Sequence, residues 1–217
     1  MIRKFQKDMM NSMSNTIVMN FDVAANYTLE NDLVRLEPLQ ESHFANLFTE
    51  SLQNPEIWKY SSLLAIGEEN FRNYIQFALK NREKLTEYPF AVFDKRTNEY
   101  AGSTRFYDIQ LSNKTLQLGY TWYGKQFHGT GLNKHCKYLL LEFAFEKMNM
   151  ERVEFRADNA NERSKAAMKS IGCKVDGVLR SNMIKLDGTR RDSIILSILR
   201  DEWFDEVREN IKNKSNF

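Results

Sequence analysis

Two strand-like segments in the middle of the chain are separated by a glycine-containing loop and a long amphipathic helix. The first segment, residues 115–122, alternates its side chains so that both faces of a strand are used. Apolar residues then recur at steps of three and four from Leu132 to Phe143, which predicts a helix to about Met148. Residues 152–157 (RVEFRA) form the next predicted strand. A strand, a crossover helix and a second strand make a βαβ unit, so we expect these two strands to pair in parallel.

The segments before this unit predict an antiparallel meander. Residues 33–39, 88–95 and 99–109 have strand-like patterns. Short polar turns connect residues 88–95 to residues 99–109, and residues 99–109 to the strand at 115–122, so these three strands form the meander. Residues 41–52 and 68–80 carry apolar side chains at helical spacing. Two helices are therefore expected between the first strand and the meander.

The segments after the unit predict a short helix over residues 161–171, ended by Gly172, and then a hairpin. Its turn is Asp187-Gly188, a strong hairpin signal, and a final amphipathic helix follows. The whole pattern predicts an α/β (α+β) fold. We expect a central mixed, mostly antiparallel sheet of about six to seven strands with helices on both faces.

The length of 217 residues is typical of one domain. The first 26 residues are polar and rich in methionine, and their longest apolar stretch, residues 17–19, is far too short for a signal-peptide core or a membrane span. We expect residues 1–26 to be a loosely ordered leader and residues 27–213 to form a single domain.

Charge and cysteine content exclude several classes of protein. A net charge of +2 lacks the basic excess of a nucleic-acid-binding protein. The two cysteines, Cys136 and Cys173, form no CxxC pair and no cluster with histidines, so neither a zinc site nor a disulfide framework is expected. Reduced cysteines in the core are typical of a cytoplasmic protein.

Residues 124–134 (GKQFHGTGLNK) are the most informative stretch. Glycines let a backbone approach a ligand closely, and the free N–H groups of a first helical turn suit a pyrophosphate. A Walker loop would need a lysine directly after Gly129, and a dinucleotide fingerprint would need a third glycine at Lys134, so neither pattern fits. Gln126, Gly129 and Gly131 form Q-x-x-G-x-G, which resembles the coenzyme A pyrophosphate loop of the GNAT superfamily of N-acetyltransferases.

The second half of the chain extends this resemblance. Residues 158–203 resemble the RimJ/RimL-like branch of the superfamily, the ribosomal-protein-alanine and -serine N-acetyltransferases. In that branch an N-x-x-S helix start is followed by a glycine, a G-x-L-R segment and an aspartyl-glycine hairpin, all of which occur here. The resemblance covers roughly residues 28–205. It implies the GNAT fold, with a splayed parallel pair of strands in the middle of the sheet.

The resemblance also implies that acetyl-CoA is the acetyl donor and that it lies between the splayed strands. Backbone N–H groups near Tyr120 would polarise its carbonyl group, and Asn161 would bind its pantetheine arm. The residues expected to bind acetyl-CoA are Tyr120, Thr121, Trp122, Gln126, Phe127, His128, Gly129, Thr130, Gly131, Leu132, Asn133, Asn161 and Ser164. The residues expected to line the acceptor pocket are Trp58, Arg105, Tyr107 and Gln117.

Each of these assignments has a purely structural alternative. The two loop glycines suit an ordinary turn before a helix, Asn161 is a favourable N-cap, and the aromatic residues suit a core. Lysines such as Lys134 and Lys137 could neutralise the phosphates of the coenzyme, but lysines on exposed helix faces are more often plain solvated charge.

Two positions depart from the family pattern. Many relatives have a glutamate at the position of Gln117, and an amide cannot take a proton from an ammonium. Many members of the wider superfamily have a proton-donating tyrosine at the position of Met168. The catalytic residues are therefore unassigned. The candidates for the base are Asp108, Glu37, His128 and a water chain, and those for the acid are Ser164 and solvent.

We therefore expect an N-acetyltransferase that moves an acetyl group from acetyl-CoA to a primary amine by direct attack in a ternary complex. The amine would belong to a protein N-terminus or to a small molecule. A hypothesis of another class is an acetyl-CoA-binding sensor or assembly protein with little activity. No metal is expected, and neither nucleic acid nor a membrane is an expected partner, whereas a homodimer is compatible with these expectations.

Overall fold

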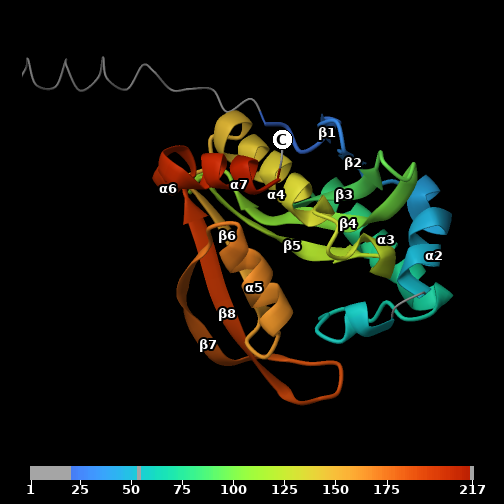
Figure 1. The fold of residues 1–217 in the computed structure, drawn as a ribbon. Helices are drawn as coiled ribbons and strands as arrows, with labels where there is room; N and C mark the ends of the chain where they lie inside the picture. The colour runs from blue at the N-terminus through green and yellow to red at the C-terminus, as the bar shows by residue number, and fades with distance from the viewer. Residues whose placement is uncertain (1–20, 53–54, 216–217) are drawn as a thin grey trace, which may run out of the picture.

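An eight-stranded sheet forms the centre of the computed structural model, which describes residues 21–52 and 55–215 (Figure 1). Its strand order is β1-β2-β3-β4-β5-β6-β8-β7. The strands are β1 (Leu29–Glu30), β2 (Val34–Pro38), β3 (Glu87–Asp94), β4 (Glu99–Gln110), β5 (Thr115–Tyr123), β6 (Arg152–Asp158), β7 (Lys174–Ile184) and β8 (Arg190–Leu199). All neighbours are antiparallel except β5 and β6, as the βαβ pattern predicts. The sheet has one strand more than the six to seven expected from the sequence, and the additional strand is β1, whose two residues are too few to show any periodicity.

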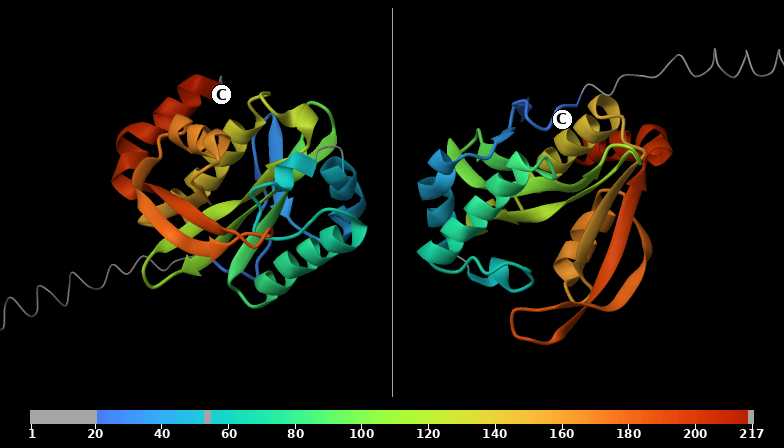
Figure 2. Two further views of the ribbon diagram at one scale, coloured as in Figure 1. Left: turned by 90° about the horizontal axis from the view of Figure 1, so that it is seen from below. Right: turned by 180° about the vertical axis from the view of Figure 1, so that it is seen from behind.

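Helices cover both faces of the sheet (Figure 2). The helical elements are η1 (Glu41–His43), α2 (Phe44–Leu52), η2 (Pro55–Trp58), α3 (Glu68–Glu83), η3 (Lys125–Phe127), α4 (Leu132–Glu142), η4 (Phe143–Lys147), α5 (Glu162–Ser170), α6 (Arg200–Glu202), η5 (Trp203–Val207) and α7 (Arg208–Ser215). Elements α2 and α3 lie on one face, and α4, α5 and the C-terminal helices lie on the other. None of the helices in the described part of the chain is long and apolar enough to cross a membrane.

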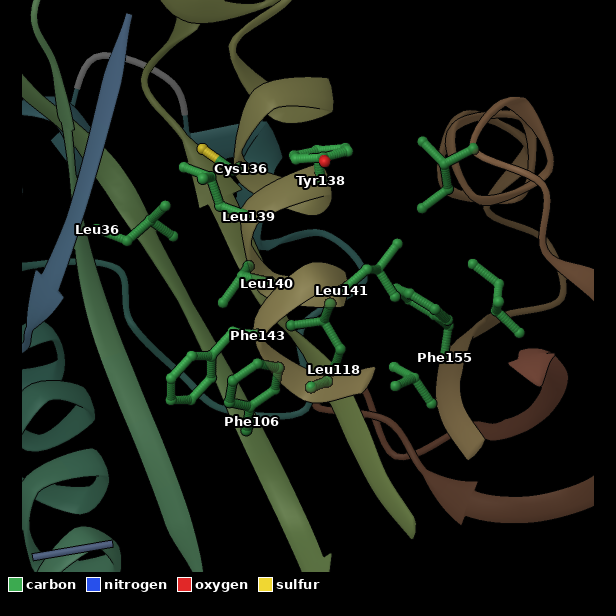
Figure 3. Close-up of a cluster of buried hydrophobic side chains, with 14 of the residues drawn as sticks. Leu36, Phe106, Leu118, Cys136, Tyr138, Leu139, Leu140, Leu141, Phe143 and Phe155 are labelled. Atoms are coloured by element: carbon green, nitrogen blue, oxygen red, sulfur yellow. The ribbon is translucent and has the colours of Figure 1, made fainter. Parts of the chain in front are cut away.

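The main core lies between the sheet and α4. Figure 3 shows side chains of α4 between Phe106 of β4 on one side and Phe155 of β6 on the other. Phe21 and Val23 are also buried in this core, so the domain reaches further towards the N-terminus than residue 27. Residues 1–20 of the expected leader lie outside the described residues.

Strands β5 and β6 separate soon after they begin to pair. Their parallel register begins with Thr115 opposite Arg152 and ends with Gln117 opposite Glu154. Beyond these residues each strand keeps its outer neighbour, β4 or β8, and the two halves of the sheet diverge (Figure 1). The splayed parallel pair that the family resemblance implies is therefore present.

A β-bulge in β5 accompanies this divergence. Tyr120 and Thr121 both lie opposite the single residue Thr104 of β4. Tyr120 has a φ of 49°, in the left-handed region that a side chain enters only at a conformational cost. Because a bulge bends its strand and increases the local twist, it turns the end of β5 away from β6.

A lysine lies inside the core beside the bulge. Lys137 projects from α4 and is only 6% exposed. Its Nζ donates a hydrogen bond to Thr121 Oγ1 at 2.8 Å and lies 5.7 Å from the ring centroid of Phe155. Among the described residues, no carboxylate lies within 4.0 Å of this nitrogen. Burial lowers the pKa of Lys137 to about 8.

Gly102 lets β4 approach β5 closely next to the bulge, which leads to a first prediction. A Cβ at Gly102 would lie 2.0 Å from the carbonyl oxygen of Trp122, and this backbone atom cannot move without separating the strands. We expect Gly102→Ala to lower the free energy of unfolding by about 3 kcal/mol, measured in urea. Gly177→Ala in β7 is the matched control, because nothing lies within 4 Å of a Cβ there. Equal losses in both variants would contradict the steric explanation.

A second prediction is that Lys137→Met stabilises the fold at neutral pH. The pKa of this lysine is 10.5 for a free side chain and about 8 in the fold, so its charge opposes folding by about 3 kcal/mol at pH 7. Between pH 8 and pH 10.5 the unfolded chain binds more protons, so the wild-type protein gains stability as pH rises through this window. Urea unfolding at pH 7 and pH 10 should show an advantage of the variant that shrinks with pH. An advantage that stays constant would sink the electrostatic explanation.

Candidate functional site

The loop between β5 and α4 is shaped by glycines. Gly129 and Gly131 have φ values of 75° and 85°, in the left-handed region that glycine enters without steric cost. Gly131 is the N-cap of α4. Nothing lies within 4 Å of a Cβ at either glycine, so the space in front of the loop is open.

The backbone of this loop offers free hydrogen-bond donors. Within the described chain, the N–H groups of Gly129, Thr130 and Gly131 donate to no acceptor. At the start of α4 the N–H of Asn133 also has no acceptor among the described residues, whereas the Leu132 N–H donates to Thr130 Oγ1 at 3.4 Å; both lie at the positive end of the helix dipole. Free N–H groups in such an arrangement bind a phosphate or pyrophosphate, which fits the phosphates of coenzyme A.

Hydrogen bonds to residues outside the loop hold the loop in place. Gln126 Nε2 donates to Glu50 Oε2 of α2 at 2.5 Å, and burial raises the pKa of Glu50. Arg96 Nη1 donates to the carbonyl oxygen of Thr130 at 3.0 Å, while its Nη2 pairs with Asp94 Oδ2 at 2.6 Å. The side chain of Gln126 is thus engaged by the protein, and the backbone of the loop is left to face a ligand.

Three further loop residues predicted to bind acetyl-CoA have side chains with structural contacts. Phe127 and Leu132 are buried in the main core. Asn133 Oδ1 accepts a hydrogen bond from the Tyr123 hydroxyl at 3.2 Å. Any contact of these residues with a ligand would therefore come from their backbone.

His128 is fixed by the backbone of β5. Its Nε2 lies 3.0 Å from the carbonyl oxygen of Tyr123, so this nitrogen carries the proton and donates it. Burial lowers the pKa of His128, which favours the neutral ring at pH 7. The remaining nitrogen, Nδ1, is then an acceptor, so a base role for His128 is chemically open.

The inner edges of β5 and β6 form the second part of the site. Past Gln117 and Glu154 the two edges face each other without pairing, so the N–H and C=O groups directed between them have no partner strand. The bulge residues Tyr120 and Thr121 lie on this stretch of β5. An extended arm with amide groups fits between such edges, because it can accept and donate the hydrogen bonds of a missing strand.

The N-terminus of α5 supplies the third part. Asn161 is its N-cap, and Oδ1 accepts a hydrogen bond from the Ser164 N–H at 3.0 Å, which confirms the capping interpretation. In the described part of the chain neither the Asn161 amide nitrogen nor the Ser164 hydroxyl has a partner. Both groups are therefore free for a ligand.

Gln117 lies at the fork of the two strands, on the sheet face away from α4. Its Nε2 donates to Asp108 Oδ2 at 2.8 Å, and both residues line a cavity of about 180 Å³. Glu154 of β6 lines the same cavity and is paired with Arg152 at 3.1 Å and Arg156 at 2.6 Å. Asp108 is thus the carboxylate in contact with Gln117.

No group of three or more potential ligands for a metal ion exists among residues 21–52 and 55–215.

The other residues expected in the acceptor pocket lie in the core between the sheet and α3. Trp58 and Trp122 are each 5% exposed, and their ring centroids are 5.2 Å apart. Arg105 is fully buried, pairs with Glu87 at 2.7 Å, and lies 4.1 Å from the ring centroid of Tyr120. Both indole N–H groups lack a hydrogen-bond partner among the described residues. The structure brings these residues together as a packed wall behind β5.

Tyr107 joins this wall from β4. Its ring contacts that of Tyr120 at 5.0 Å between centroids, in an edge-to-face arrangement. A Cβ at Gly119 would lie only 2.9 Å from the Tyr107 ring, so a glycine at this position lets the tyrosine ring contact β5. Burial raises the pKa of Tyr107 far above neutral pH, so its hydroxyl stays protonated.

A larger cavity, of about 360 Å³, lies at the C-terminal end of α4, beside η4. Its lining includes Phe21, Phe143 and Lys147, and most of its surface is apolar. The loop and this cavity are separated by the length of α4 and η4. A cavity with such an apolar lining does not suit a pyrophosphate.

Sequence reasoning missed the roles of Glu50, Glu154 and Lys137. Neither glutamate lies in a motif, because each meets its partners through the fold alone. Lys137 did carry a signal. The helix is apolar on nearly all sides from residue 138 to residue 145, which is typical of a helix enclosed by other elements, so a lysine directly before this run is expected to be buried.

Comparison with known proteins identifies the family. The model of a family described as an acetyltransferase (GNAT) domain matches residues 34–174. The Bacillus subtilis protein named "Putative ribosomal N-acetyltransferase YdaF" is 30% identical over 102 residues, which are 47% of this chain and 55% of that protein. The matched part thus spans about half the length of that relative.

Solved structures resemble most of this chain. A protein described as a putative acetyltransferase from T. thermophilus is 33% identical with a TM-score of 0.78, and the match covers 88% of this chain and 98% of that one. The microcin C7 self-immunity acetyltransferase MccE, solved in complex with acetyl-CoA and AMP, is 23% identical with a TM-score of 0.69. That match covers 78% of this chain and 93% of MccE, and at this identity it concerns the fold alone. Because the family model spans more than half of the chain, and the sheet is splayed between β5 and β6, this chain belongs to the GNAT family of N-acetyltransferases, in its RimJ/RimL-type group.

Proposed function

We propose that this protein transfers an acetyl group from acetyl-CoA to a primary amine by direct attack within a ternary complex. The observation that carries the proposal is the set of unpaired backbone N–H groups at the start of α4, placed at the end of the strand that diverges from β6. MccE shares the fold and was solved with acetyl-CoA, which supports the same donor here. Family membership favours an enzyme over a sensor with little activity.

Each part of the site has a separate task. The N–H groups of Gly129, Thr130, Gly131 and Asn133 bind the pyrophosphate, and the open edges of β5 and β6 bind the pantetheine arm. Asn161 donates its free amide N–H to the same arm. Backbone N–H groups near the Tyr120 bulge polarise the thioester carbonyl, and fixed donors of this kind stabilise the charge that develops on its oxygen.

The nucleophile is a neutral amine that reaches the site without a dedicated base. Gln117 cannot accept a proton from an ammonium, and its amide is held by Asp108. Proximity and carbonyl polarisation then supply the rate, and the neutral fraction of the acceptor limits it. An α-amino group has a pKa of roughly 7.7–8.0, whereas a lysine side chain has one near 10.4. A protein N-terminus or a small amine of low pKa is therefore the favoured acceptor.

An acceptor screen tests this function directly. Peptides with a free α-amino group, the same peptides with a blocked N-terminus and an internal lysine, and small amines are incubated with acetyl-CoA, and thiol release is followed. We expect release with free α-amino groups and little with the blocked peptides. The absence of release with every amine, in a protein that binds acetyl-CoA, would favour the sensor.

The loop assignment gives a third prediction. Gly131→Ala adds a methyl group where the pyrophosphate approaches, so we expect the Kd for acetyl-CoA to rise about tenfold or more by calorimetry. The methyl group also strains the backbone by roughly 1–2 kcal/mol. Gly188→Ala is the matched control, because Gly188 has a φ of 79°, has open space around it, and lies in the hairpin turn. Equal affinities in the two variants would refute the assignment.

The absence of a base gives a fourth prediction. For an α-amino peptide the rise of kcat/KM with pH should follow the acceptor, with a midpoint near pH 8, since this parameter reports ionisations of free enzyme and free substrate. Gln117→Glu should move the rise to lower pH. Asp108→Asn should leave it unchanged, and asparagine tolerates the φ of 47° at this position. A rise near pH 7 with every acceptor would instead reveal a base on the enzyme.

A further inference from the structure

The ammonium group of Lys137 lies at the opening between β5 and β6. Its Nζ is 2.8 Å from Thr121 Oγ1 on β5 and 5.7 Å from the ring centroid of Phe155 on β6. The two strands no longer pair at these positions, because their register ends at Gln117 and Glu154. The charged group therefore reaches from α4 to the space that we assign to the pantetheine arm.

The surroundings of this cation contain no counter-ion among the described residues. Thr121 Oγ1, its only hydrogen-bond partner in that part of the chain, is itself 2.7 Å from Thr104 Oγ1. The titratable groups that act on Lys137 are the thiols of Cys136 and Cys173. Burial raises the pKa of both thiols to about 12, so neither is an anion at neutral pH.

An unpaired charge of this kind is costly inside a protein, and buried lysines are rare unless they are paired. A neutral side chain of similar length would fill the same space without the penalty. The arrangement therefore indicates an anion that is absent from the resting protein and forms during turnover. Acetyl transfer from a thioester produces one anion in this space, the leaving thiolate.

We infer that Lys137 stabilises and protonates the thiolate that leaves during acetyl transfer. This inference rests on the proposed function. It also accounts for Met168, which stands where the wider superfamily has a proton-donating tyrosine and which cannot donate a proton.

The proton and electron balance of the step is complete. The amine nitrogen forms a bond to the thioester carbonyl carbon, and the C–S bond breaks with its electron pair on sulfur. Lys137 gives one proton from Nζ to that sulfur, which yields the thiol of coenzyme A. The acetylated nitrogen releases its surplus proton to water, and water returns a proton to Lys137. A pKa of about 8 keeps the lysine charged at pH 7 and allows this transfer.

Titration of the bound thiol tests the inference without turnover. Coenzyme A is bound to the wild-type protein and to Lys137→Met, and thiolate formation is followed by ultraviolet absorbance between pH 6 and pH 9.5. We expect the midpoint to lie at least one pH unit lower in the wild-type complex, which corresponds to about tenfold in the ionisation constant. Cys136 and Cys173 do not interfere, because their pKa values are about 12.

A ligand without sulfur provides the second measurement. By calorimetry at pH 8.5, Lys137→Met should weaken binding of coenzyme A about fivefold relative to desulfo-coenzyme A, because a thiol with a pKa near 8.5 is only partly ionised at this pH. The control variant Lys134→Met removes a charge one turn earlier on the same helix. It should change the affinities for both ligands equally, because a charge near the phosphates does not distinguish them by their sulfur.

The possible outcomes separate the hypotheses. Identical thiol titrations in wild type and Lys137→Met, in variants whose urea unfolding shows an intact fold, would overturn the inference and leave Lys137 as a structural partner of Thr121. Mass-spectrometric detection of an acetyl group on Lys137 would also overturn it, because the lysine would then be a nucleophile. Failure of the wild-type protein to bind either ligand would reject the proposed function itself.

Discussion

The pairing of β5 with β6 ends after Gln117 and Glu154, and the rest of the site depends on the separation of the two strands beyond these residues. Two strand edges that face each other without hydrogen bonds are unfavourable, because buried backbone groups need partners. The bulge at Tyr120 and Thr121 nevertheless keeps the strands apart. The fold thus maintains a gap in its own sheet, and a ligand with amide groups can complete the hydrogen bonding there.

The N–H donors at the start of α4 are available for a ligand because other groups of the loop make the hydrogen bonds that fix it to the protein. Glu50 holds the side chain of Gln126, and Arg96 holds the carbonyl oxygen of Thr130. The glycines then direct N–H groups outward in conformations that most side chains would oppose. A site preorganised in this way loses little further conformational freedom when an anion binds.

The sequence predicts the order of elements well, because each follows from local patterns: the βαβ unit, the hairpin at Asp187-Gly188 and the N-cap Asn161. The bounds of the helices and strands also agree closely. Contacts between distant segments could not be predicted in this way. The partner of Gln126 comes from α2, and the burial of Lys137 depends on the sheet and on the helices that enclose α4. Such contacts depend on packing, and the apolar run after Lys137 signals its burial only indirectly.

The packed indoles behind β5 have an optical consequence. The protein has three tryptophans, and two of them, Trp58 and Trp122, lie with their ring centroids 5.2 Å apart. The third, Trp203, lies 5.7 Å from Phe145 in the core on the other face of the sheet. Rings so close couple their electronic transitions, so the near-ultraviolet circular dichroism of the protein depends strongly on the geometry of this pair. The wall behind the bulge therefore contains an intrinsic spectroscopic reporter of its own conformation, with Trp203, in the core on the other face of the sheet, as an internal reference.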